Sequence, residues 1–147
     1  MIKRTLLKTA GNLAQPSVEA AKEFEEKQDF IVHEMNTLMN KRPDLKKLIG
    51  ENNSAMMEDN HRNQYRFFVS LFRDYNPDTL VETVLWVYRA YRSHGFRLTY
   101  WPAQLDQWLG LFKAHFSEKT YAEIYPFYHW MIIHQASFAS LTDDSIT

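Results

Sequence analysis

NPDTLVETVLWVYRAYRSHG, residues 76–95, predicts one complete helix with a signal at each end. Asn76 can cap the helix, Pro77 suits its first position, and Asp78 places an acid in the first turn. At the other end, Gly95 can adopt the left-handed conformation that closes a helix, and basic residues precede it. The apolar positions between the two ends follow the spacing of one helical face: Leu80, Val84, Val87 and Tyr91. This stretch must therefore bury that face against other elements.

The rest of the chain continues the same pattern. Only four glycines and five prolines occur among 147 residues, and almost all lie where a helical pattern would need interruption. No segment alternates with period two for long enough to predict a strand. Pro126 lies inside the last helical segment and predicts a kink or a break. Further helices are expected at about 18–41, 44–49, 53–74, 99–116 and 117–138. The fold class is therefore predicted as all-α, a bundle of about six helices.

Length and composition indicate one folded domain. A chain of this size buries roughly 70% of the surface that its unfolded form exposes, and 15% of its residues are aromatic, enough to dominate the interior or to line a pocket. We expect an N-terminal arm or short helix at 1–16, the helical domain at 17–139 and a flexible tail at 140–147.

Charge and cysteine usage exclude several partners and compartments. Seventeen basic and eighteen acidic residues give a formal net charge of −1, so no global field favours nucleic acid or an anionic membrane. No run approaches 18 apolar residues, and the N-terminus lacks the apolar core of a signal peptide. The absence of cysteine fits a reducing compartment. We expect a cytoplasmic protein that binds neither nucleic acid nor membranes.

No catalytic motif is visible in the sequence. A Gly-x-Ser-x-Gly elbow and a glycine-rich phosphate loop are both missing. Glu58 and His61 match the Glu-x-x-His spacing of di-iron bundles once, but a second copy is lacking. His129 and His134 are five residues apart, which separates them around a helix by about 140°. The sequence therefore predicts that the protein is not an enzyme.

The order of the elements resembles the globin fold: a long helix, a short proline-started helix, a long helix with His61, a helix ending in His94 and two further long helices. This resemblance implies a globin-like bundle with His94 near the proximal position, as ligand of a haem iron, and His61 near the distal one. A haem needs an apolar slot and an axial imidazole. The aromatic residues expected near such a pocket are Phe67, Phe68, Trp86 and Tyr91.

A closer resemblance involves Asn76-Pro77-Asp78-Thr79-Leu80-Val81-Glu82-Thr83-Val84-Leu85-Trp86, followed by Tyr91 and His94-Gly95. This segment is similar to the helical N-terminal domains of bacterial regulators that precede a cobalamin-binding or STAS domain. Related stressosome sensor domains are globin-like, often without haem. This sequence departs from the pattern with Asn76 in place of Asp and His94 in place of Arg, and we expect no effector domain downstream of it.

These resemblances imply two functions. The first is a non-enzymatic sensory or regulatory domain without a cofactor, which acts through a protein partner or by self-association as a homodimer. The alternative is a haem-binding, globin-type gas sensor or carrier that uses His94 and His61.

Overall fold

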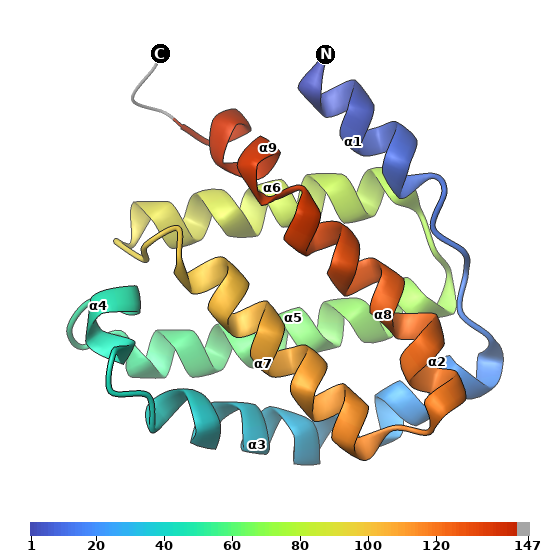
Figure 1. The fold of residues 1–147 in the computed structure, drawn as a ribbon, viewed down its shortest axis with the longest axis horizontal. Coiled ribbons are helices and arrows are strands. Elements are labelled where there is room, and N and C mark those ends of the chain that lie inside the picture. Colours follow the sequence, from blue (N-terminus) through green and yellow to red (C-terminus); the bar gives the residue numbers. More distant parts are fainter. Residues whose placement is uncertain (144–147) are drawn as a thin grey trace.

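The computed structural model describes residues 1–143. In this part of the chain, nine helices are joined by turns and loops, and there is no strand (Figure 1). In chain order the helices are α1 (Ile2–Ala10), α2 (Val18–Glu26), α3 (Gln28–Asn40), α4 (Leu45–Ile49), α5 (Ser54–Arg73), α6 (Pro77–Ser93), α7 (Tyr100–His115), α8 (Glu118–Ile133) and α9 (Gln135–Leu141). The predicted all-α class is confirmed. Residues 144–147 of the predicted tail lie outside the described residues, and α9 extends into the first part of it, as far as Leu141.

Helix α6 has the two ends that the sequence predicts. The side-chain oxygen of Asn76 accepts hydrogen bonds from the backbone N–H groups of Asp78 at 2.9 Å and Thr79 at 3.3 Å. Gly95 has φ of 84°, and the N–H of Phe96 donates to the carbonyl of Tyr91 at 2.9 Å. The Phe96 ring also stacks on the Tyr91 ring, with centroids 5.0 Å apart. This arrangement is a Schellman motif with its hydrophobic contact, and it fixes the Tyr91 side chain.

The helix expected at 18–41 is two helices, α2 and α3, which meet at Lys27. The Lys27 ammonium donates to the Glu23 carboxylate at 2.8 Å and to the backbone carbonyl of His115, at the end of α7. A cation is favourable at that end of a helix. The break allows α2 to pack against α8 while α3 packs against α7. Tertiary contacts therefore divide a segment whose periodicity alone favours one helix.

The helix expected at 117–138 is also two helices, but the break is not at Pro126. Helix α8 continues through Pro126, and the chain turns at His134, where φ is −105° and ψ is 11°. Helix α9 then packs against α1 and α6. Phe138 of α9 is fully buried against Trp101 and Trp130. The burial of this ring gives a physical reason for the turn.

The helices form two packed groups. In the first, α1, α6 and α9 pack on one another; in the second, α5 packs against α2 and α3, and α7 packs against α3 and α8. In Figure 1, α5 and α6 run side by side while α7 and α8 cross both groups diagonally. Helices α5 and α6 are not among the closely packed pairs. The two helices therefore meet through side chains rather than through close backbone packing.

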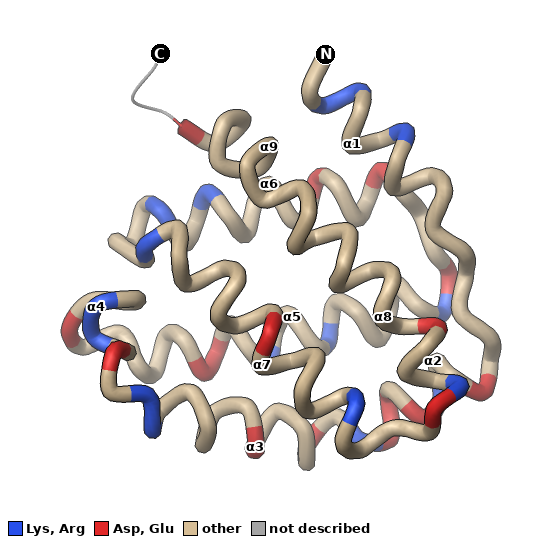
Figure 2. The backbone as a smooth tube through the Cα atoms, viewed as in Figure 1, with Lys and Arg blue, Asp and Glu red and all other residues tan. Residues whose placement is uncertain are grey.

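Charged residues of both signs are mixed along the part of the chain that the structure describes. Figure 2 shows basic and acidic residues interspersed along the helices. No helix within residues 1–143 combines the length and apolar character needed to span a bilayer.

Candidate functional site

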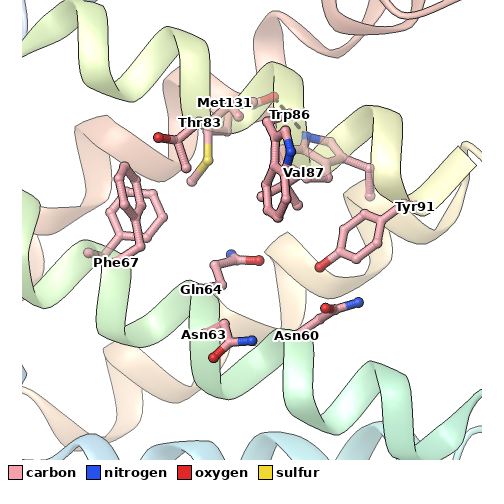
Figure 3. A pocket seen from close by; sticks show the side chains of 12 residues that line it. Asn60, Asn63, Gln64, Phe67, Thr83, Trp86, Val87, Tyr91 and Met131 are labelled. Atoms are coloured by element: carbon pink, nitrogen blue, oxygen red, sulfur yellow. Dashed lines mark hydrogen bonds between the residues drawn. The ribbon is translucent and has the colours of Figure 1, made fainter.

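A cavity of about 170 Å³ lies between α5 and α6, with further walls from α7 and α8 (Figure 3). It is lined by Asn60, Asn63, Gln64, Phe67, Phe68, Thr83, Val84, Trp86, Val87, Tyr91, Trp101 and Met131. For scale, an engineered apolar cavity of about 150 Å³ binds benzene. The cavity is thus large enough for one aromatic ring with a small substituent.

The walls of this cavity are mostly aromatic and apolar. The indole N–H of Trp101 donates to the backbone carbonyl of Met131 at 3.3 Å, so only the apolar part of this ring is offered to the cavity. Phe68 is buried, whereas Trp86 is 69% exposed and joins the cavity to solvent. A ligand could therefore enter past the Trp86 indole.

Two polar side chains inside the cavity have unused hydrogen-bonding groups. Gln64 is only 9% exposed, yet neither its amide nitrogen nor its amide oxygen has a partner among residues 1–143. The Tyr91 hydroxyl lies close enough to the Tyr100 hydroxyl to interact with it, but it has no hydrogen bond of normal geometry to any residue in 1–143. In Figure 3 the Gln64 amide and the Tyr91 hydroxyl point toward the same space. Buried polar groups are nearly always paired, so this pair needs an explanation.

The side chains that line the cavity are all neutral. None of the residues that line it is charged or a histidine. Burial raises the pKa of Tyr91, so its hydroxyl stays protonated at neutral pH, and the neighbouring Tyr100 hydroxyl opposes part of the rise. The cavity therefore offers neutral donors and acceptors, without a general base, a nucleophile or a counter-ion.

The local sequence explains how both polar groups reach the cavity. Gln64 belongs to the inward-facing stripe of α5, where Met57, His61 and Phe68 are also buried at spacings of three and four residues. Tyr91 is held by the capping motif at the end of α6. Both side chains are positioned by regular helices, which gives the site a rigid frame.

His61 is buried in a separate, satisfied cluster. Its Nδ1–H donates to the side-chain oxygen of Asn36 at 2.7 Å, and its Nε2 accepts from the Tyr100 hydroxyl at 2.9 Å. Burial lowers the pKa of His61 to about 3, so the ring is neutral at physiological pH. The ring also meets Trp108 edge-on, with centroids 5.6 Å apart. Both nitrogens are engaged, and neither is free to bind an axial ligand.

His94 lies on the surface at the end of α6. Its Nδ1 bonds the backbone carbonyl of Ala90 at 2.8 Å, and neither His94 nor His61 lines the cavity. The two imidazoles thus do not face a common space. Haem does not fit this arrangement, because a cavity sized for one ring cannot take a macrocycle and no axial imidazole points into it.

The structure brings together three of the five predicted binding residues. Phe68, Trp86 and Tyr91 line one cavity, and so does Phe67. Gln64 was not among the predicted binding residues, although its place as a polar residue within the apolar stripe of α5 is visible in the sequence. It also missed Trp101 and Met131, which the chain brings to the cavity from distant segments.

No group of three His, Asp or Glu side chains within residues 1–143 is arranged to hold a metal ion. Comparisons with protein-family models, with curated proteins and with solved structures find no match for the chain.

Proposed function

We propose that this protein is a non-enzymatic sensory domain that binds a small, uncharged molecule between α5 and α6. Binding changes the packing of the α1–α6–α9 group on the remaining helices, and a protein partner or a second copy of the chain recognises that change. The sensory role follows the resemblance of residues 76–95 to the helical domains of bacterial regulators. The globin-like description of the fold stays a prediction.

The observation that carries the proposal is the unpartnered Gln64 amide inside an apolar cavity. A buried polar group without a partner costs about 1–3 kcal/mol. An interior position that only had to pack would be served better by leucine or methionine. A ligand that pairs with the amide offsets this cost, which is the behaviour of a binding site.

The helix packing supports a signal that leaves the cavity. Helix α6 is tied to α1 and α9 by surface contacts: Lys3 pairs with Glu82 at 2.5 Å, and the Arg92 guanidinium donates to the carbonyl of Ala139 at 2.7 Å. Because α5 belongs to the other group, a molecule between α5 and α6 contacts both groups at once. A ligand that prefers one relative placement of the two groups shifts the equilibrium toward it.

The rim of the cavity supplies a surface for that signal. Trp86 is a large exposed aromatic residue on α6, directly at the cavity. Aromatic residues of this kind are favoured at protein–protein contacts. A ligand that orders or displaces the Trp86 indole would alter what a partner or a second copy of the chain meets.

Hydrogen–deuterium exchange on the full chain tests this function. The protein is measured alone and with saturating toluene, phenol, indole or benzamide, and sedimentation velocity is recorded in the same buffers. We expect at least one probe to slow exchange in α5 and α6 and to change exchange in α1 or α9. A change in exchange confined to the cavity, with no effect on α1, α9 or self-association, would leave a ligand pocket without a signal and contradict the sensory role.

A filled cavity supplies the control. Val84 is buried and lines the cavity, so V84F places a ring in the space that the ligand would take. We expect the V84F protein to remain folded and to show no response to any probe. A response that persists in V84F would place binding elsewhere.

A further inference from the structure

We infer that the cavity selects a neutral aromatic molecule bearing a carboxamide-like group, in which a hydrogen-bond donor stands beside an acceptor. This inference rests on the proposed function, since it names the ligand class of the same cavity. A primary amide on a single ring is the simplest member of the class, because one of its N–H groups lies on the same side as its carbonyl oxygen.

The Gln64 amide sets the donor and acceptor requirement. Its nitrogen and its oxygen are both buried and both unpartnered. A ligand that satisfies both must accept from the nitrogen and donate to the oxygen, from adjacent positions. A carboxamide does this with two parallel hydrogen bonds, and it does so whichever way round the Gln64 amide is placed.

The Tyr91 hydroxyl adds a second polar point. It belongs to the opposite wall, on α6, and points into the space that the Gln64 amide faces (Figure 3). A carbonyl oxygen has two lone pairs, so it can accept from the Gln64 nitrogen and from the Tyr91 hydroxyl together. One carboxamide therefore engages both helices.

The neutral walls exclude charged relatives of the same shape. A carboxylate keeps the acceptor oxygens but loses the donor, and no basic side chain lines the cavity to compensate its charge. Moving an unpaired carboxylate out of water is far more costly than moving an amide. An acid therefore binds poorly for two reasons: it has no donor for the Gln64 oxygen, and its charge is unpaired in apolar surroundings.

The aromatic walls set the remaining shape. Phe67, Phe68 and Trp101 line the cavity with ring surfaces. Aromatic pairs gain free energy beyond simple burial when rings lie offset or edge to face. With a cavity of about 170 Å³, a single ring fits while its amide reaches Gln64.

Affinity for three matched probes tests this inference. Benzamide, toluene and benzoate are titrated into the isotope-labelled full chain, and binding is followed by NMR through the side-chain NH₂ signals of Gln64. We expect benzamide to bind at least tenfold more tightly than toluene and to shift the Gln64 signals. Benzoate should give no shift at concentrations that saturate the site with benzamide.

Variants make the prediction specific. In Q64L, the affinity for benzamide should fall at least tenfold, while toluene should bind as tightly as before or more tightly. The order of the two affinities is then reversed. Q104L is the matched control, since Gln104 is another buried glutamine with an unpartnered nitrogen but does not line the cavity. It should keep the wild-type order. Y91F provides a second, milder test, with a loss of about threefold for benzamide alone.

The outcomes separate the two proposals. If toluene binds to the wild-type protein as tightly as benzamide, or if Q64L keeps the preference for benzamide, the ligand class is wrong and the pocket remains. If no probe of either panel binds, the proposed function fails together with this inference.

Discussion

His61 and Gln64 lie three residues apart on the same face of α5, and both are buried polar side chains, but their surroundings differ completely. Each nitrogen of His61 has a hydrogen-bond partner, whereas neither end of the Gln64 amide has one among residues 1–143. The difference teaches that burial alone does not decide the role of a polar residue. Partners decide it.

The partnered region is structural. His61 joins Asn36 of α3 to Tyr100 of α7, so one imidazole links three helices. Removing one member of such a cluster leaves the others buried without partners. The unpartnered region is a site for binding, because its polar groups remain available to an incoming molecule. The same substitution at the two positions should therefore have opposite effects.

The largest expected effect is that of H61L. Leucine fills the space but takes the partner from the buried Tyr100 hydroxyl, at a cost of about 1–3 kcal/mol, and from the Asn36 oxygen, which is only partly buried. We expect the free energy of unfolding to fall by about 2–4 kcal/mol in urea denaturation at pH 7. A fall in the free energy of unfolding of less than about 0.5 kcal/mol would show that the hydrogen-bonded region around His61 is no more important for stability than the region around Gln64.

Acid should weaken the His61 cluster selectively. The folded-state pKa of about 3 lies below the ordinary value of 6.5, so the unfolded chain takes up a proton first. The stabilisation is complete above about pH 6.5 and is lost as the pH falls toward 3, with a slope of about 1.4 kcal/mol per pH unit. Between pH 6.5 and pH 5 we expect a loss of about 2 kcal/mol, measured by urea denaturation at each pH.

A control variant separates His61 from His134. Burial and the nearby His129 also lower the pKa of His134, though this side chain is only partly buried. H134Q should retain most of the pH dependence, whereas H61L should lose it. The reverse result would assign the acid sensitivity to the end of α8.

The Q64L protein should be more stable than the wild type. The change replaces two unpartnered polar atoms with an apolar side chain of similar size. The free energy of unfolding should therefore rise by about 1 kcal/mol. Thermal and urea denaturation without ligand measure this gain, and benzamide should stabilise the wild type more than Q64L. If Q64L is destabilised as strongly as H61L, the amide has a structural partner and the comparison fails.

The smallest effect is expected for Y91F. Its hydroxyl has no partner of normal geometry, so its removal should change the free energy of unfolding by only about 0.5 kcal/mol or less. Y100F, the same change on the neighbouring ring, breaks the bond to His61 and should cost about 1 kcal/mol or more. Equal losses in the two variants would show that Tyr91 belongs to the partnered cluster.

Part of the candidate site could be predicted from the sequence. Phe68, Trp86 and Tyr91 were expected near one pocket and do line one cavity; helical periodicity explains Phe68 and Tyr91, whereas Trp86 is 69% exposed at its edge. The pairing of His61 with His94 followed from element order alone, and the structure places these imidazoles apart. Element order does not specify the rotation of each helix, and rotation decides which side chains face a common space.

The sequence by itself determined the helical class and both ends of α6, because capping and apolar periodicity depend on residues within a few positions of one another. Only the tertiary structure decided the breaks at Lys27 and His134 and the placement of Gln64 and Tyr91 on the walls of one cavity. Those features depend on contacts between distant segments, such as the ammonium of Lys27 on the end of α7. Periodicity indicates which face of a helix is buried. The packing of the other helices determines which side chains that face contacts.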